Sequence, residues 1–586
     1  MRPERRCAKL CGLHARTTAY LSMEIALEDE IPTFSGGLGV LAGDFLRAAA
    51  DRGLPVVGVT LLYHRGFFHQ GLDADGRQVE RPVHWNPADH LERLDARVKV
   101  TVADRRVMVG AWRRVLTGVG GDTVPVYFLD TLLPENDPAD QTITGQLYTD
   151  LPAQRLSQEA VLGLAGPAML RELGHDQIDT FHMNEGHAAL APVALLADRL
   201  GGGLLGASPA DIESVRDRCV FTTHTPVPAG HDRFAPEVVD AVLGPELAGQ
   251  LAELGCLEGG TLNMSVLGMF FSGYVNAVAR RHGDVARAMF PQYWIDAITN
   301  GVHAATWAAP STARLLDRHV PGWRRDSTMI RYAGTIGLDE VRAAHAEAKQ
   351  VLADEVARRR GVALDPAALT IGVARRAAAY KRNDLLLSRP DALRALVARV
   401  GPLQVLYSGK AHPSDDAGKA VIAHVNAVAK ELAGEVTVVY LEDYGMSLAG
   451  LLVAGVDVWL NTPMAPYEAS GTSGMKAALN GVPSLSVLDG WWLEGWVEGA
   501  TGWAVGGDRG AGADRPVGDP TVDAADAAEL HRVLADVVAP LYYEDPDGFA
   551  AVRRHAISLN GSFFNAQRMV DEYAARAYRR AEGADG

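Results

Sequence analysis

The stretch that organises this chain is VDVWLNTPMAPYEASGTSGMKAALNGV, residues 456–482. Its first residues alternate apolar side chains and predict a buried strand. The small-residue loop Ser470–Gly474 follows, then a helix expected over Met475–Leu479, with Lys476 in its first turn. Strand, glycine-rich loop and helix is an arrangement in which backbone N–H groups and the helix dipole hold an anion, usually a phosphate. Lys476 is then a counter-charge, the amine that binds a phosphorylated aldehyde such as pyridoxal phosphate, or a solvated lysine beside a tight turn.

The same stretch resembles the cofactor-lysine signature of the glycogen phosphorylase family. The resemblance rests on Glu468–Thr472, Met475-Lys476 and Asn480-Gly481, with Ser473-Gly474 in place of the family's usual Gly-Asn. It implies that Lys476 carries pyridoxal 5′-phosphate. It also implies that Gly471, Thr472 and Ser473 contact the cofactor and that Glu468 and Ser470 contact the substrate.

The composition is that of a globular enzyme. At 586 residues the chain exceeds the size at which single cores stop growing, so two or more domains are expected. A net charge of −16 argues against nucleic acid or an anionic membrane as the main partner. The four cysteines are too few for a disulfide framework and lack zinc-site spacing, which predicts reduced thiols, no metal and a cytoplasmic protein. The sequence has no secretory signal and no apolar run of about 18 residues, so no membrane span is expected.

Strands and helices alternate along the chain. Strands are expected at 18–22, 56–62, 98–102, 123–129, 219–223, 369–373, 404–408, 436–441 and 485–488, and helices at 40–50, 158–173, 188–200, 275–280, 339–360 and 527–581. This alternation predicts an α/β fold of two doubly wound, Rossmann-like domains facing a cleft, the GT-B glycosyltransferase architecture. We place the domains at 1–305 and 306–586. The resemblance adds a terminal helix, near 568–573, that crosses back to the first domain.

A second loop-then-helix anion site lies near the N-terminus, at Ser35–Gly39. By the resemblance, Gly37 would place its backbone N–H on the substrate phosphate. Nucleotide-sugar glucan synthases have a similar loop with a lysine ahead of the glycines. Residues 33–35 read Thr-Phe-Ser and contain no lysine, which favours a phosphorylase.

A basic cluster follows the expected strand 369–373. Arg375, Arg376, Tyr380 and Lys381 stand close together there, which is unusual in an acidic protein and predicts an anion site rather than a basic surface turn. The resemblance implies that Arg376 and Lys381 bind the reacting phosphate. It also implies that Arg375 replaces a lysine in contact with the cofactor, and that Tyr380 orients the sugar.

Further motifs stand in the family's order along the chain. The resemblance implies that His224 and Asn300 orient the glucosyl unit, and that Glu185 and His187 contact substrate. It places Tyr444 and Trp307 beside the cofactor; the expected catalytic set is Lys476, Arg376, Lys381, Gly37 and His224.

These matches imply a short α-glucan phosphorylase. It would cleave the terminal α-1,4 bond of glycogen or maltodextrin with inorganic phosphate and release α-glucose 1-phosphate with retention. Two alternatives stay open: a nucleotide-sugar glucan synthase on the same architecture, and a non-catalytic glucan-binding relative. A homo-oligomer is compatible with the phosphorylase prediction. Because about 17 residues precede the first expected strand, allosteric regulation by AMP or by phosphorylation is expected to be absent.

Overall fold

The computed structural model describes residues 16–507 and 518–578. Residues 1–15, 508–517 and 579–586 lie outside this part of the chain. Cys7 and Cys11 do so as well, whereas Cys219 and Cys256 are buried free thiols. No helix among the described residues is both long and apolar enough to cross a membrane.

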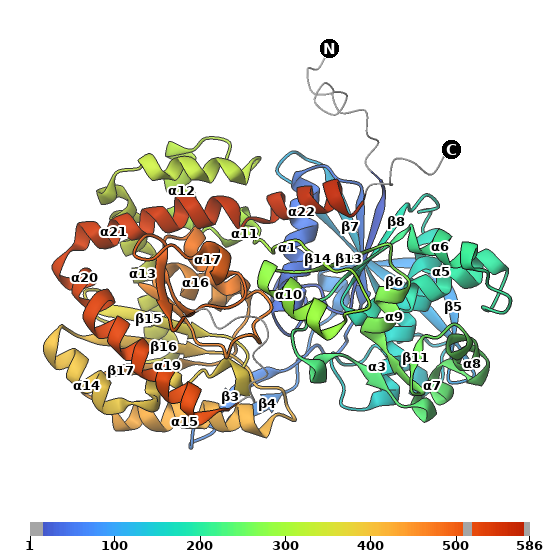
Figure 1. Cartoon of the computed structure of the whole chain (residues 1–586), viewed down its shortest axis with the longest axis horizontal. Helices are drawn as coiled ribbons and strands as arrows, with labels where there is room; N and C mark the ends of the chain where they lie inside the picture. The colour runs from blue at the N-terminus through green and yellow to red at the C-terminus, as the bar shows by residue number, and fades with distance from the viewer. Residues whose placement is uncertain (1–15, 508–517, 579–586) are drawn as a thin grey trace, which may run out of the picture.

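The N-terminal half is built on a nine-stranded sheet, drawn on the right of Figure 1. Seven strands run parallel, and β6 and β5 continue the sheet antiparallel at one edge. The order is β14 (Asp296–Ala297), β13 (Tyr274–Ala277), β9 (Cys219–Thr222), β8 (Thr180–Asn184), β1 (Thr18–Ser22), β2 (Val56–Leu61), β7 (Thr123–Asp130), β6 (Arg105–Thr117) and β5 (Glu92–Val102).

The C-terminal half is built on a six-stranded, fully parallel sheet, drawn on the left. The order is β17 (Thr437–Leu441), β16 (Leu403–Ser408), β15 (Leu369–Ala374), β18 (Val458–Asn461), β19 (Ser484–Val487) and β20 (Gly502–Val505). The prediction of an α/β fold with large parallel sheets is thus confirmed. β3 (His69–Leu72) and β4 (Gln78–Arg81) form a separate hairpin. A small antiparallel sheet has the order β10 (Arg233–Phe234), β12 (Thr261–Asn263) and β11 (Leu257–Glu258).

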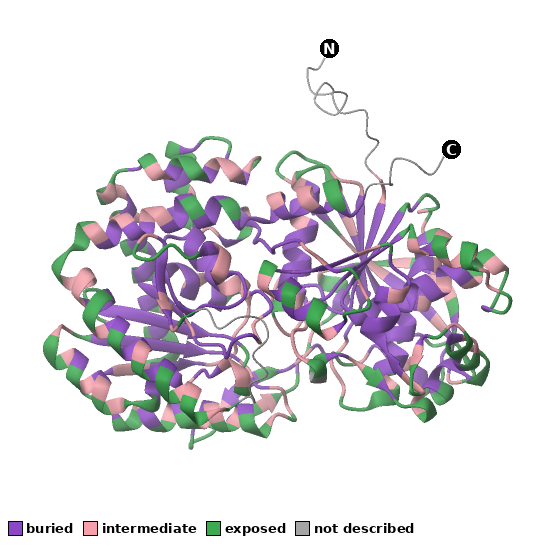
Figure 2. Cartoon of the chain, in the orientation of Figure 1, coloured by how far each residue is buried: buried purple, intermediate pink, exposed green. Residues whose placement is uncertain are grey.

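Helices cover both sheets, so the strands are the most deeply buried elements (Figure 2). Around the first sheet lie α1 (Gly37–Asp51), α3 (Pro152–Ala160), α4 (Gly166–Glu172), α5 (Ala191–Leu200), α6 (Pro209–Arg216), α7 (Pro236–Leu243), α8 (Pro245–Glu253), α9 (Met264–Phe270) and α10 (Arg280–Met289). After α11 (Ala304–Trp307) and α12 (Pro310–His319) come α13 (Leu338–Arg360), α14 (Pro390–Arg399), α15 (Asp416–Glu431), α16 (Met446–Gly455), α17 (Thr472–Leu479), α19 (Pro520–Val533), α20 (Ala539–Glu544), α21 (Pro546–His555) and α22 (Ala566–Arg576).

Several segments of the described chain connect the two halves, among them the following three. The β3–β4 hairpin reaches the second sheet, where the Gln70 amide donates to the carbonyl of Gly409 at 2.7 Å. In Figure 1, α22 runs from the C-terminal half onto the first sheet, where Met569 and Tyr573 share a buried cluster with Phe45 of α1. The Asp29 carboxylate accepts hydrogen bonds from the first amides of α16, including that of Met446 at 2.7 Å.

Three local predictions need correction. Residues 275–280 were expected to be helical, but β13 occupies Tyr274–Ala277 and pairs with β9 and with the edge strand β14. A β-branched, apolar segment flanked by two strands gains more from ladder bonds than from one helical turn. Strand β6 was not predicted, because its polar side chains hide the alternation. Helix α17 begins at Thr472, so Lys476 lies in its second turn.

Candidate active site at the carboxyl ends of the sheets

Each sheet has one point at which the strand order reverses. In the second sheet the reversal lies between β15 and β18, and in the first it lies between β1 and β8. Ligands of open α/β sheets bind in the crevice outside the carboxyl ends of the strands at such a point. The basic cluster follows β15, the Lys476 loop follows β18, and the glycine loop follows β1. Tertiary structure therefore brings the main sequence motifs to the two expected ligand crevices.

The basic loop after β15 presents one cation that is paired and one that is not. Lys381 Nζ donates to Glu468 Oε2 at 2.7 Å and lies over the Tyr380 ring. Arg376 is exposed and forms no ion pair with any described residue. Desolvation by surrounding protein atoms lowers the pKa of Arg376, but Tyr380, Tyr148 and Glu24 together raise it above its usual value. Arg376 is therefore charged and available to bind an anion.

Arg375 is held differently from its neighbour. Its side chain is buried, and its three nitrogens donate to Asn383 Oδ1, Asn461 Oδ1 and Thr462 Oγ1 at 2.8, 3.4 and 2.6 Å. Burial lowers the Arg375 pKa to about 10, while the charge of Glu468 opposes that shift. The structure thus places Arg375 as a link between the loops that follow β15 and β18.

The loop after β18 is shaped for an anion at the start of α17. Gly471 precedes the helix at φ +83°, a left-handed conformation that favours glycine. At Gly474 a Cβ atom would lie 2.8 Å from the Trp491 ring, so close packing requires a glycine there too. The hydroxyl of Ser470 is buried and has no hydrogen-bond partner among the described residues. Ser473 Oγ accepts from Trp459 Nε1 at 3.1 Å, which positions the first turn of the helix.

Lys476 is 6% exposed, and its side chain makes no hydrogen bond or ion pair in the part of the chain that the structure describes. Its Nζ lies 3.9 Å from the centroid of the Trp307 ring, and the Trp307 Nε1 donates to both carboxylate oxygens of Asp44 at 2.9 Å. Burial lowers the Lys476 pKa to about 8, while the charge of Asp44 opposes the shift. Tyr444 packs against the buried apolar cluster that contains Trp307. A buried amine without a partner, with a lowered pKa, fits the covalent attachment of pyridoxal phosphate.

This pKa predicts how the rate of cofactor attachment to the apoprotein depends on pH. The neutral amine is the nucleophile, and a pKa near 8 leaves roughly one Lys476 in ten neutral at pH 7, against fewer than about one in a thousand for an ordinary lysine. The rate of appearance of the bound-cofactor absorbance band should therefore rise from pH 6 to about 8 and then level off. A rate that keeps rising tenfold per pH unit up to pH 10 would contradict the assignment.

The glycine loop after β1 is held by a carboxylate. Glu24 Oε2 accepts from the N–H groups of Ser35 and Gly36 at 2.6 and 3.3 Å, and Glu24 Oε1 accepts from the Tyr148 hydroxyl at 2.7 Å. A Cβ atom at Gly37 would meet nothing within 4 Å, so the loop is open at that residue. The N–H of Gly37, at the start of α1, makes no hydrogen bond to another described residue. Glu24 thus holds the loop beside Gly37, whose N–H group has no hydrogen-bond partner among the described residues.

His224 and Asn300 line one small buried cavity, together with Asn184. The ring Nε2 of His224 lies 2.6 Å from Asn184 Oδ1, and burial lowers the His224 pKa to about 4. The ring is therefore neutral at pH 7. Asn300 Oδ1 is buried and lacks a hydrogen-bond partner among the described residues. Both side chains can therefore offer hydrogen bonds to a polar group that enters the cavity.

Glu185 and His187 have neighbours of their own. The Glu185 carboxylate accepts from the His224 N–H at 2.7 Å and from the Thr225 hydroxyl at 3.0 Å, so it holds the loop that carries His224. Its φ of +76° is unusual for a non-glycine residue and is maintained by these bonds. His187 Nε2 lies 3.3 Å from Asp232 Oδ2, within a buried cluster. The structure thus places Glu185 behind His224 and gives His187 a partner outside the small cavity.

Sequence reasoning missed Glu24, Asp44 and Tyr148. Glu24 and Asp44 each contact a motif residue more than ten positions away, and Tyr148 contacts Glu24, so no local pattern marks them. A carboxylate in an otherwise apolar stretch, as at Glu24 and Asp44, is the one available signal, since buried charges need partners. Among the described residues no group of three or more His, Cys, Asp or Glu side chains could hold a metal ion.

The fold and the site together define an α/β enzyme with basic and glycine-rich loops suited to phosphate groups. Comparison with known proteins agrees with this. The family model described as carbohydrate phosphorylase matches residues 19–117 and 231–497. The chain belongs to the carbohydrate phosphorylase family.

Several curated relatives match nearly the whole chain. A maltodextrin phosphorylase of Thermococcus litoralis is 37% identical, with 96% of this chain and 70% of the relative aligned. A glycogen phosphorylase of Mycobacterium tuberculosis is 35% identical over 97% of this chain and 72% of its own length. A glycogen phosphorylase of Aquifex aeolicus is 32% identical, with 98% of this chain and 88% of the relative aligned.

Proposed function

We propose that this enzyme is an α-1,4-glucan phosphorylase that depends on pyridoxal phosphate. It transfers the terminal glucosyl unit of glycogen or maltodextrin to inorganic phosphate and releases α-glucose 1-phosphate with retention of configuration. The observation that carries this proposal is the arrangement of Arg376, Lys381, the Gly37 amide and Lys476 around the carboxyl ends of both sheets. The names of the aligned relatives support the same activity.

The proposed architecture has two domains of the GT-B type, 1–305 and 306–586, with substrate in the cleft between them. Support comes from the two separate sheets, each with its own buried cluster. Helix α22 then belongs to the C-terminal part of the chain but packs on α1, where Gly301 and Val302 contact the residues that precede it.

Two phosphate groups are bound by different residues of the site. Arg376, Lys381 and the Gly37 N–H bind the phosphate that attacks the glycosidic bond, and Arg375 braces the loop beside them. Two phosphate groups repel each other, so they approach closely only where cations and amides compensate their charge. Bound on Lys476 and the start of α17, pyridoxal phosphate would supply a second phosphate that exchanges a proton with the first.

The sugar is oriented by neutral groups. His224 and Asn300 offer hydrogen bonds from the small cavity, and Tyr380, Glu468 and Ser470 lie on the opposite loops. A carboxylate nucleophile of the glycosidase kind is not required, because the substrate phosphate faces the developing positive charge. The Glu468 carboxylate forms an ion pair with Lys381, which holds the carboxylate in place and compensates its charge.

The test is phosphorolysis of maltodextrin by the purified holoenzyme. Glucose 1-phosphate should form only when inorganic phosphate is present, and ³¹P and ¹H NMR should identify the α-anomer as the first product. Glucosyl transfer from a nucleotide sugar, with no phosphate-dependent release, would instead identify a glucan synthase. Absence of both activities in protein that contains cofactor would favour the glucan-binding alternative.

Replacement of Glu24 tests how the glycine loop is held. Glu24→Ala removes both amide contacts and the Tyr148 contact, so we expect the KM for phosphate to rise by about ten- to a hundredfold, since small displacements of a binding group are costly. Glu24→Gln keeps an oxygen acceptor for the two amides and should restore most of the affinity. Steady-state kinetics with phosphate and with glucan varied separately provide the measurement. A KM for phosphate in Glu24→Ala equal to that of the unmodified enzyme would show that the loop does not depend on this side chain.

A further inference from the structure

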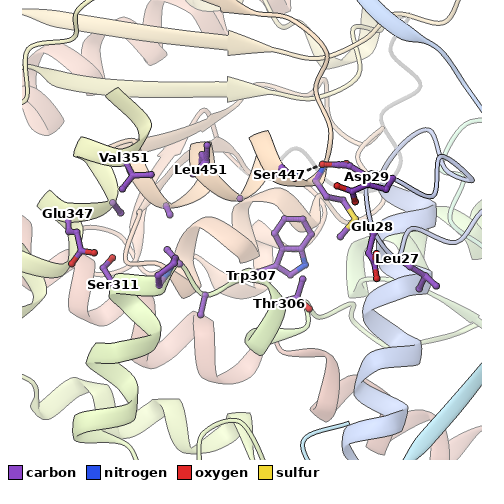
Figure 3. A pocket seen from close by; sticks show the side chains of 18 residues that line it. Leu27, Glu28, Asp29, Thr306, Trp307, Ser311, Glu347, Val351, Ser447 and Leu451 are labelled. Atoms are coloured by element: carbon purple, nitrogen blue, oxygen red, sulfur yellow. Dashed lines mark hydrogen bonds between the residues drawn. The ribbon is translucent and has the colours of Figure 1, made fainter. Parts of the chain in front are cut away.

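A second cavity lies apart from the basic and glycine-rich loops. It has a volume of about 440 Å³ and lies between residues 27–30, residues 306–311, helix α13 and helix α16 (Figure 3). Small-molecule sites typically occupy about 300–1,000 Å³. Lys476, Arg376 and Lys381 do not line it, whereas Trp307 does. The cavity therefore has the size of a ligand site and touches the proposed catalytic site only through one indole ring.

The walls of the cavity are mainly apolar. Val351 and Leu451 extend from α13 and α16, and alanine, proline and methionine side chains complete the surface. Val351 is 48% exposed, which places it at the mouth rather than in the core. Such a surface favours a ligand with an apolar body.

The charged residues that line the cavity are all acidic: Glu28, Asp29, Glu30 and Glu347. Ionised carboxylates only accept hydrogen bonds, so they favour a ligand that donates. The backbone amides at the start of α16 offer no site for an anion, because Asp29 already accepts from Met446 and Ser447 at 2.7 and 2.8 Å (Figure 3). Arg114 and Arg314, which pair with Glu28 and Glu347, do not line the cavity.

A second observation points independently to a ligand. Ser311 lines the cavity at the end where Glu347 lies, and only 5% of the residue is exposed. Its hydroxyl oxygen has no hydrogen-bond partner in the described part of the chain. Buried hydroxyl groups are normally hydrogen-bonded, so an unpaired one in a cavity wall is a contact that a bound molecule can complete.

We propose that this cavity binds a small organic cation, an amine or amidinium group carried on an apolar body. The cationic group lies between Glu347 and the Ser311 hydroxyl, and the apolar body lies against Val351, Leu451 and the Trp307 edge. Anions of the same shape are excluded, because no cationic side chain lines the cavity. This proposal does not depend on the reaction that the enzyme catalyses.

The test uses benzamidinium and benzoate, two probes of similar shape and opposite charge. Isothermal titration calorimetry of the holoenzyme at constant ionic strength should detect benzamidinium binding and at least tenfold weaker benzoate binding. Saturating phosphate and maltodextrin should not displace benzamidinium. Benzoate binding of equal strength, or displacement by the substrates, would overturn the proposal.

Matched variants locate the probe. Val351→Trp fills the mouth of the cavity and should abolish binding, whereas Gln350→Trp adds the same side chain to the same helix outside the lining and should leave binding unchanged. Glu347→Gln should weaken binding at least fivefold, whereas Asp354→Asn, also on α13 and exposed, should not. Unchanged affinity in Val351→Trp, or equal losses in Glu347→Gln and Asp354→Asn, would contradict the assignment. Far-ultraviolet circular dichroism verifies that each variant is folded.

Discussion

Lys476→Ala is expected to reduce glucan phosphorolysis to background and to remove the absorbance band of bound pyridoxal phosphate. The reason is that one buried amine, with its pKa lowered to about 8, is the proposed attachment point. The measurement is turnover and the near-ultraviolet and visible spectrum of the purified variant. Lys430→Ala, which removes an exposed lysine from α15, is the matched control and should behave as the unmodified enzyme. Full turnover in the Lys476 variant, with the band intact, would rule out the proposed role.

Lys476→Ala should fold, and the pH dependence of its free energy of unfolding tests whether the Lys476 pKa is lowered. Lys476 has a lower pKa in the folded apoprotein than its value of 10.5 in an unfolded chain, so the unfolded chain binds more protons between pH 8 and 10.5. The contribution of Lys476 to the free energy of unfolding therefore becomes more favourable as pH rises through this window. Lys476→Ala should lack that slope, which chemical denaturation of the two apoproteins at pH 8 and 10 can measure. An identical slope in both would mean that Lys476 titrates normally.

Arg376→Ala is expected to weaken the use of phosphate far more than the binding of glucan. It removes an exposed, unpaired cation from the crevice, and the loss of one group that stabilises developing charge costs roughly 2.7–4 kcal/mol, or about 10²–10³ in kcat. Kinetics with phosphate varied at saturating maltodextrin, combined with maltodextrin binding measured by calorimetry, separate the two effects. Arg358→Ala removes a surface arginine that pairs with Glu355 and is the matched control.

Lys381→Ala should give a similar kinetic loss with an additional change. Lys381 is paired with Glu468, so its removal leaves a carboxylate without its counter-charge beside the phosphate. We therefore expect phosphate affinity to fall at least as far as in Arg376→Ala, because repulsion adds to the lost attraction. Lys381→Ala combined with Glu468→Gln should recover part of the loss. Equal loss of glucan and phosphate affinity in either single variant would contradict a phosphate-specific role.

Local sequence patterns are sufficient to predict most of the parallel strands and the loops that follow them. Apolar, β-branched runs bounded by glycine and proline predict strands such as β1, β15 and β16 to within a residue, because such strands are buried on both faces. The glycine loop before α1 and the Lys476 loop are also recognisable from consecutive residues, because each needs only backbone amides and small side chains in succession. Collinear motifs then indicated the family, which the comparison with known proteins confirms.

Tertiary structure alone decided which of these loops meet. The strand orders put the reversal points between β15 and β18 and between β1 and β8, and strand order depends on pairing between residues far apart in sequence. The same long-range packing made β13 a strand, buried Lys476 against Trp307 and Asp44, and turned Glu24 toward the glycine loop. A lowered lysine pKa and a cavity lined by four separate segments follow from burial and three-dimensional proximity, which the one-dimensional pattern of residues does not contain.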